Sequence, residues 1–184
     1  MKQQIFYSVA DFFRSNSALK SKDILFISQA LFLWIKTSNE QKLDDDQYYK
    51  GKEGISDRFE RFFYNFCDGY HYDIRKVIKL SDESFYAIVE KVNNSLRNGL
   101  ITYFDVAEIA FQLSSQEQDF ETQTPNELVE LGSGLLSGNI TSAYCPFTAS
   151  YRFAEALSLQ NKDVYIELSN ESDTAWTRMS ADLK

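Results

Sequence analysis

Apolar residues recur at intervals of three and four positions through residues 1–112, which is the spacing of one face of an α-helix. The first such stripe comprises Ile5, Val9, Phe12 and Phe13. A second stripe, at residues 24–35, is almost continuously apolar and predicts a central helix that contacts neighbours on several sides. The polar stretch at residues 37–54 contains too few apolar residues to be buried, so it is predicted as a loop.

Three further helices are predicted before residue 115. The first covers residues 56–67, and its aromatic face is expected to pack in the core rather than to stack on nucleic-acid bases. Ser81 is expected to cap a second helix that continues to residue 96 and ends at Asn98 and Gly99. The third helix is predicted at residues 103–113. The aromatic face comprises Phe59, Phe62, Phe63 and Phe66.

After residue 114 the pattern changes to alternating helices and strands. Thr124 and Pro125 are expected to open a helix that continues to residue 136, because threonine is a good N-cap and proline is tolerated at the first helical position. The elements predicted next are strands at residues 139–147 and 163–168 and helices at residues 149–160 and 171–183. Two strand-helix units in succession predict a parallel sheet. The predicted fold is therefore mainly α, with a helical bundle over residues 1–114 followed by a partial α/β segment over residues 115–184.

The charge is distributed unevenly along the chain, whose net charge is -8. Residues 1–112 carry 16 acidic and 15 basic groups, whereas residues 113–184 carry 11 acidic and 4 basic groups. Lysine and arginine side chains that neutralise phosphates supply most of the non-specific affinity of proteins for DNA. We therefore expect this chain to contact DNA only within a complex that includes a basic partner.

The positions of the cysteines and the length of the longest apolar run indicate which cellular compartment and which kinds of site to expect. Cys67 and Cys145 lie far apart without CxxC spacing, which favours neither a disulfide framework nor a zinc site. The apolar run at residues 24–35 is shorter than the roughly 20 residues that span a bilayer. Asp11 and Arg14 fall where a signal peptide requires an unbroken apolar region. We therefore expect a cytoplasmic protein with no metal site and no membrane partner.

Two motifs in the second half of the chain carry a family resemblance. Residues 124–136 read Thr-Pro-x-x-Leu-Val-x-Leu-x-x-x-Leu-Leu, and the other motif lies at residues 144–153. Both resemble the methylase subunit of type I restriction-modification systems, an adenine-N6 DNA methyltransferase family whose second motif reads Tyr-Asp-Pro-Ala-Cys-Gly-Ser-Gly-Gly-Phe. Residues 6–14 and 30–36 resemble the first two helices of the family's helical domain. The residues that match the second motif in register are Tyr144, Pro146, Ser150 and Phe153.

The resemblance implies a Rossmann-like methyltransferase fold for residues 115–184 and S-adenosylmethionine as the cofactor. The positions that match the family's cofactor-binding residues are Thr124, Pro125, Cys145, Ala149 and Asn170. In the family an acid at the end of the second strand holds the ribose hydroxyls, and Glu167 and Glu171 are alternatives to Asn170 for this role. Alignment of Trp176 with the family's next aromatic residue favours Asn170.

The second motif departs from the family at the residues that would contact the cofactor. Cys145 replaces the acid of the motif, and Ala149, Tyr151 and Arg152 replace its three glycines. Tyrosine and arginine side chains at a tight turn between a strand and a helix occupy space that the cofactor needs, and non-glycine residues resist positive φ. We therefore expect that this chain does not bind S-adenosylmethionine.

The catalytic motif of the family is absent from the sequence. Adenine-N6 methyltransferases use an Asn/Asp-Pro-Pro-Tyr/Phe tetrapeptide to hold the extruded adenine, whereas Pro125 and Pro146 are the only prolines here and are not adjacent. No catalytic residue is therefore assigned. The resemblance implies specificity and restriction subunits as partners. Two hypotheses stay open: a part or degenerate relative of a methylase subunit that is not catalytic by itself, and a complete non-enzymatic interaction or regulatory module.

Other candidate chemistry is weaker. His71 is the only histidine and no Gly-x-Ser-x-Gly elbow accompanies it. The sequence Gly132-Ser133-Gly134 lacks the Lys-Ser/Thr of a phosphate-binding loop, so we interpret it as a weak point near a helix end. The acidic run at residues 44–46 lacks the spaced ligands of a calcium loop, which favours a solvated linker.

Overall fold

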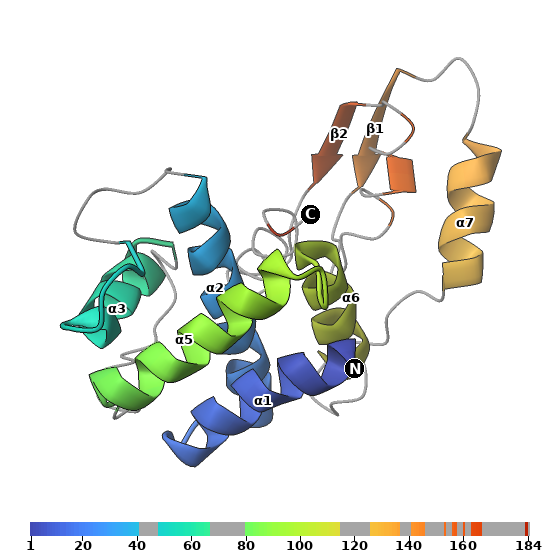
Figure 1. Cartoon of the computed structure of the whole chain (residues 1–184). Helices are drawn as coiled ribbons and strands as arrows, with labels where there is room; N and C mark the ends of the chain where they lie inside the picture. Colours follow the sequence, from blue (N-terminus) through green and yellow to red (C-terminus); the bar gives the residue numbers. More distant parts are fainter. Residues whose placement is uncertain are drawn as a thin grey trace. The chain divides into compact units, whose positions relative to one another are not determined.

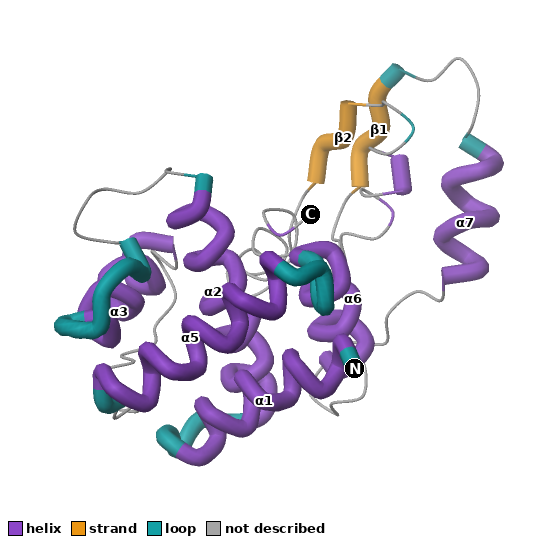
Figure 2. Tube along the Cα trace, viewed as in Figure 1, coloured by secondary structure: helices purple, strands orange, loops and turns teal. Residues whose placement is uncertain are grey.

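The structure is a computed structural model that describes residues 1–40, 48–66, 80–114, 126–136, 141–145 and 163–166, with the single residues 153, 156, 157, 160 and 183 (Figure 1). The chain divides into two compact units. The helical unit comprises Met1–Glu117 and Met179–Lys184, and the strand unit comprises Gln118–Arg178. The described residues are mainly helical, as predicted, and include two short strands (Figure 2).

The two apolar stripes at the start of the chain form the first two helices of the helical unit, α1 (Lys2–Ser15) and α2 (Ser21–Asn39). Every residue from 24 to 35 is buried, so α2 is the central helix, as predicted. The apolar run is almost continuous because α2 is surrounded by other helices on several sides. Helix α2 contacts α1, α3 (Ile55–Phe66), α5 (Asp82–Arg97) and α6 (Tyr103–Ser114).

The predicted loop after α2 begins later than expected, because the helix continues to Asn39. The hydroxyl of Thr37 donates to the carbonyl oxygen of Leu33 at 2.9 Å, which keeps this polar side chain within the helical turn. The Nζ atom of Lys36 lies 5.7 Å from the centroid of the Tyr103 ring on α6. The prediction that residues 37–39 belong to a loop is therefore wrong, since tertiary contact extends a helix whose last turn is polar.

An aromatic core joins four helices of the helical unit. It comprises Phe13 of α1, Trp34 of α2, Phe59 of α3 and Phe85 of α5, none of which is accessible to solvent. The ring centroid of Trp34 lies 5.3 Å from that of Phe59 and 6.1 Å from that of Phe85. The Phe59 and Phe85 centroids lie 5.2 Å apart. These separations are typical of favourable aromatic pairs, so each of the four helices contributes a ring to one shared cluster.

The aromatic face of α3 packs inward, as predicted. Phe59, Phe62 and Phe63 are all buried, and Phe63 also makes an edge contact with Phe26 of α2 at 5.8 Å between centroids. Buried rings are not available to stack on bases. The predicted helix at residues 56–67 is observed one residue earlier at its start, at Ile55, and is described to Phe66.

The ends of α5 and α6 follow the rules of helix capping. The Ser81 hydroxyl accepts a hydrogen bond from the backbone N–H of Ser84 at 3.3 Å, which confirms the predicted cap. Helix α5 ends at Asn98 and Gly99, as predicted, and Gly99 adopts a φ of +66°. Helix α6 begins with a capping box in which Thr102 and Asp105 each accept the other's backbone N–H, at 2.9 and 3.1 Å.

The described elements of the strand unit are α7 (Asn126–Leu135), β1 (Ser142–Cys145) and β2 (Asp163–Ile166). The two strands pair in parallel, as predicted, and the pairing begins at Ser142 with Asp163. Parallel neighbours need a long crossover connection between them. Phe153, Ala156 and Leu157 lie within that connection and are helical, in agreement with the helix predicted at residues 149–160.

Several predicted features lie outside the described residues. They are the helix opening at Thr124 and Pro125, the acidic run at residues 44–46, His71, and the helix at residues 171–183 apart from its helical residue Leu183. The division into domains 1–114 and 115–184 stays a prediction. Among the described residues, no helix combines the length and the apolar content needed to cross a bilayer.

Candidate functional site

Of the five residues predicted to line a cofactor site, the structure describes only Cys145. Cys145 is described as the last residue of β1, where it is the register partner of Ile166 of β2. Thr124, Pro125, Ala149 and Asn170 lie outside the described residues. In parallel α/β folds, ligands bind beyond the carboxyl ends of the strands, which is the end at which Cys145 stands.

The two strands have one exposed face. Tyr144 and Tyr165 are register partners, so they lie on the same face of the sheet, and their side chains are 61% and 64% exposed. Ala143 and Val164 point to the opposite face and are half-buried. Parallel sheets are almost always covered on both faces. The tyrosine face is therefore largely exposed to solvent beside the predicted cofactor end.

Helix α7 packs closely on the segment between the strands. A Cβ atom placed on Gly132 would lie 2.7 Å from Cε1 of Phe153, a non-bonded distance that real Cβ atoms essentially never show. The side-chain amide of Gln160, which also lies between the strands, donates to the carbonyl oxygen of Ser133 of α7 at 3.5 Å. Gly132 and Gly134 lie near the end of α7, as predicted, since the helix ends at Leu135, and Gly132 leaves space for the Phe153 ring. That this segment weakens the helix stays a prediction.

A second cluster of polar contacts lies in the helical unit, in the loop before α3. The Arg58 side chain donates to the carbonyl oxygens of four residues of this loop, at distances of 2.5 to 3.1 Å. The four acceptors are Tyr48, Lys50, Gly51 and Glu53. Guanidinium groups are suited to such work, since they present five donors in a fixed fork. The Arg58 side chain thus provides the loop's carbonyl groups with the hydrogen bonds that a helix or sheet would otherwise provide.

Asp82, the first residue of α5, holds the other side of this loop. Its carboxylate accepts the backbone N–H of Gly54 at 2.6 Å, the backbone N–H of Ser56 at 3.1 Å and the Ser56 hydroxyl. The hydrogen bond from the Ser56 hydroxyl is the largest of the effects that lower the pKa of Asp82. Gly54 adopts a φ of +65°, a conformation that suits glycine. Asp82 therefore caps the start of α3 from another helix.

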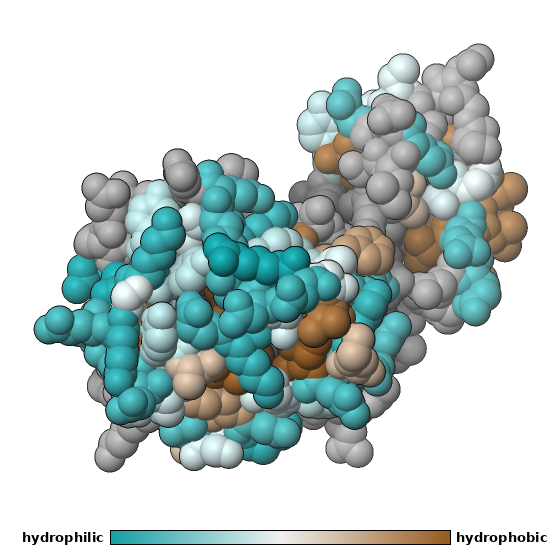
Figure 3. Space-filling model, in the orientation of Figure 1, coloured by the Kyte–Doolittle hydropathy of each residue, from teal (hydrophilic) through white to brown (hydrophobic). Residues whose placement is uncertain are grey.

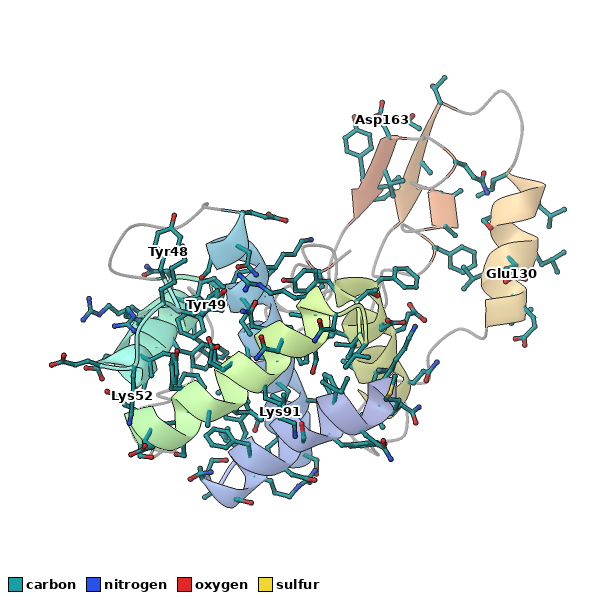
Figure 4. All side chains as sticks on the ribbon, in the orientation of Figure 1. Tyr48, Tyr49, Lys52, Lys91, Glu130 and Asp163 are labelled. Carbon is teal, nitrogen blue, oxygen red and sulfur yellow. The ribbon has the colours of Figure 1, made fainter. Side chains whose placement is uncertain are left out.

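Tyr49 connects the same loop to the ends of α2 and α5. Its hydroxyl donates to Asn39 at 3.0 Å, and the Asn39 amide donates to Asn93 at 3.4 Å. Tyr49 and Asn93 are buried, and burial raises the pKa of the Tyr49 hydroxyl. Figure 4 labels Tyr49 with its neighbours Tyr48 and Lys52 beside α3. Because each of these groups is occupied by an internal hydrogen bond, the cluster is a structural network that fixes the loop.

The described residues offer little for other chemistry. Among them, no three histidine, cysteine, aspartate or glutamate side chains lie close enough to hold a metal ion. Sequence reasoning missed both Arg58 and Asp82 as organisers of the loop. The sequence feature that could have indicated their role is the pair Gly51 and Gly54 shortly before Arg58. This spacing is typical of a loop with several turns, whose backbone carbonyl groups require a hydrogen-bond donor from a nearby side chain.

Comparisons with protein-family models, with curated proteins and with solved structures find no match to this chain. The resemblance to type I methylase subunits therefore depends on the motifs in the sequence, and its functional content is a proposal.

Proposed function

We propose that this chain is a part or a degenerate relative of a type I adenine-N6 DNA methyltransferase subunit that contributes a helical domain and the beginning of a cofactor fold. In this proposal it is cytoplasmic, is not catalytic by itself, and works with specificity and restriction subunits that supply the contacts with DNA. The strand unit is the Rossmann-like segment of the proposal. In this proposal its role is structural, because it retains the arrangement of strands and helices of the methyltransferase fold without its cofactor site.

The observation that supports the proposal most is the parallel pairing of β1 with β2 around a connection that is helical at Phe153, Ala156 and Leu157. This is the strand-helix-strand order that the second motif requires. Tyr144, which matches the motif's first residue, lies in β1, and Phe153, which matches its last residue, packs against α7 at Gly132. Tyr144 and Phe153, the two matching residues that the structure describes, thus belong to the strand and to the packing of the connection, which supports a retained frame.

The substitutions within the motif explain why we propose no catalysis. The altered positions are those where the family places an acid and three glycines, and Cys145 stands at the end of β1 where the acid would be. A cysteine side chain accepts hydrogen bonds weakly compared with a carboxylate. The proposal therefore has two parts, a retained strand-helix-strand arrangement and a lost cofactor site, and each part can be tested by experiment.

The test restores the motif in a variant that combines Cys145→Asp, Ala149→Gly, Tyr151→Gly and Arg152→Gly. We expect calorimetric titration with S-adenosylmethionine to be flat for the wild type and to show binding for this variant. Ligand at about 100 times its dissociation constant should stabilise the folded variant by about 2.7 kcal/mol. At this chain length the melting temperature should rise by roughly 5 to 10 °C.

A matched control replaces the same four residues with serine, which removes the large side chains of Tyr151 and Arg152 without restoring the acid or the glycines. Binding by the restored variant alone supports the methyltransferase frame. Equal binding by both variants, or none by a restored variant that still unfolds cooperatively, contradicts it. Binding by the wild type would instead revise the expectation that the altered turn excludes the cofactor.

A second function, a non-enzymatic interaction module, is favoured by the uncovered surfaces of the strand unit. Tyr144 and Tyr165 expose one face of the sheet, and tyrosine is enriched at protein interfaces. Large exposed apolar side chains also occur on α7, at Leu128, Leu131 and Leu135. A flat titration for the restored variant, with a folded strand unit, would favour this function over the first.

A further inference from the structure

Helix α7 buries only one side of its apolar surface. Val129 and Ser133 are buried, and Gly132 faces the ring of Phe153. In contrast, Leu128, Leu131 and Leu135 are 53%, 59% and 77% exposed. These three leucines, which we call the leucine stripe, are spaced i, i+3 and i+7, so they lie along one side of the helix. Figure 3 shows hydrophobic surface at the edge of the view over α7.

The leucine stripe is continuous with the packed side of the helix. Residues along a helix are separated by about 100° of rotation, which places Gly132 between Leu128 and Val129 around the axis. The apolar face of α7 is therefore wider than the part that the strand unit covers. A surface helix normally directs an apolar stripe of this width toward a core. Three exposed leucines in one row thus indicate a second packing surface.

The charged side chains of α7 itself are all negative. Glu127 and Glu130 are exposed on the side of α7 away from Val129, and the helix contains no lysine or arginine. Glu130 is labelled on α7 in Figure 4. Residues 118–178 as a whole carry nine acidic and three basic side chains. An occupant of the stripe therefore meets apolar side chains along its centre and carboxylates along its outer edge.

We propose that the leucine stripe binds a basic amphipathic helix of a partner protein, with the partner's apolar residues on the leucines and its lysines or arginines beside Glu127 and Glu130. This is the mode in which an amphipathic helix docks through residues at i, i+3, i+4 and i+7. A second copy of this chain is a poor occupant, since two stripes face to face would bring like charges together. The inference depends on the surface of α7 alone and is independent of cofactor binding.

The size of the surface limits the affinity. A helix of ten residues is about 15 Å long, so a partner helix can cover two to three turns of it. Interfaces of this small size are at the weak end of specific complexes. The dissociation constant is therefore expected near the micromolar range, and it should rise with salt because the rim contacts are exposed ion pairs.

The first experiment measures binding of the whole chain to a designed peptide by fluorescence anisotropy. The labelled probe has about 18 residues, with leucines at i, i+3, i+4 and i+7 and lysines or arginines on both flanks. A control peptide has the same composition with the leucines scrambled out of the stripe, and another has glutamate in place of the basic residues. We expect the designed peptide to bind at least tenfold more tightly than either control.

Variants then assign the binding to α7. The double substitution Leu131→Ser and Leu135→Ser should weaken binding at least tenfold, whereas Leu100→Ser, at an exposed leucine of the helical unit, should leave it unchanged. Glu127→Gln with Glu130→Gln should weaken binding several-fold and reduce its dependence on salt, and Glu53→Gln is the control acid. Hydrogen exchange with the peptide bound should slow at the amides of α7.

Three results would overturn the proposal. The first is equal binding of the designed and scrambled peptides, which would mean that charge alone attracts the probe. The second is equal binding by the wild type and the double leucine variant while both unfold cooperatively. The third is self-association of the wild type, seen by sedimentation and abolished in the double leucine variant, which would assign the stripe to a second copy of this chain.

Discussion

The helical unit and the strand unit differ in how far their large apolar side chains are exposed to solvent. In the helical unit, Phe13, Trp34, Phe59 and Phe85 come from four helices and are fully buried against one another. Among the described residues of the strand unit, Leu131, Leu135 and Tyr165 are more than half exposed. The helical unit therefore buries an extended aromatic core, although Phe104 is 52% exposed, whereas the described part of the strand unit exposes most of its large apolar side chains.

Because of this contrast, residues of the aromatic core should affect stability, whereas residues of the leucine stripe should affect association. A residue inside the aromatic core is expected to matter for folding, because its neighbours lose packing contacts when it is removed. A residue on the leucine stripe has few contacts to lose, so its contribution should appear only when a partner binds. Substitutions in each unit test this contrast.

The largest effect is expected for Trp34→Ala. Trp34 is fully buried and contacts the rings of Phe59 and Phe85, so its removal leaves a cavity at the junction of three helices. Losses for such large-to-small changes are about 3–5 kcal/mol of unfolding free energy. Urea unfolding followed by far-ultraviolet circular dichroism measures this loss. A value near that of a surface substitution would mean that the helical unit does not depend on its aromatic core.

The next effect is expected for Asp82→Ala, which removes the acceptor of three hydrogen bonds from Gly54 and Ser56. Leaving these donors without a partner should cost about 1–3 kcal/mol. The control is Asp57→Ala, because Asp57 is an exposed acid in the first turn of α3. Equal losses for the two variants would contradict the role of Asp82 as a cap shared between helices.

The loss in Asp82→Ala should also depend on pH. The Ser56 hydroxyl and the backbone donors lower the pKa of Asp82 in the folded protein relative to the unfolded chain. The stability contributed by this charge is therefore fully present above the unfolded pKa, about 3.9, and is lost as the pH falls through the folded pKa. Urea midpoints of the wild type and the variant should differ at neutral pH and should converge below about pH 4.

The contrast between the units also explains which features the sequence could predict. The apolar run at residues 24–35 is long and local, so the burial of α2 was predictable from it. The order of strand, helix and strand likewise predicted the parallel pairing of β1 with β2. Both inferences use patterns that stay within one element or a few consecutive elements, where period and order carry the information.

Contacts between distant residues were not predictable in the same way. The hydrogen bond from Gly54 to Asp82 joins residues 28 positions apart, and no local pattern in the sequence indicates that they meet. The contact between Gly132 and Phe153 likewise depends on how α7 packs after the chain has turned. For the candidate site, the sequence placed Cys145 at the end of a strand, but the altered motif fixes no geometry for the turn that follows.

A smaller effect is expected from a matched pair of glycine substitutions in α7. Gly132→Ala places a methyl group against the Phe153 ring, which should cost roughly 1–3 kcal/mol through overpacking, partly offset by about 1 kcal/mol from helix propensity. Gly134→Ala meets no heavy atom within 4 Å among the described residues, so it should stabilise the helix by up to about 1 kcal/mol. Native-state hydrogen exchange at the amides of α7 measures both effects. The same sign for both variants would contradict the close approach of Phe153.

The smallest effect on folding is expected for Leu131→Ser, and this result decides whether the two units differ in kind. Leu131 is 59% exposed, so its replacement removes little packing and should change the unfolding free energy by less than about 0.5 kcal/mol. The measurement is the same urea unfolding used for Trp34→Ala. A loss of several kcal/mol would mean that the leucine stripe is already covered within the chain. A negligible loss, together with weaker peptide binding, would separate the residues that fold this protein from those that serve a partner.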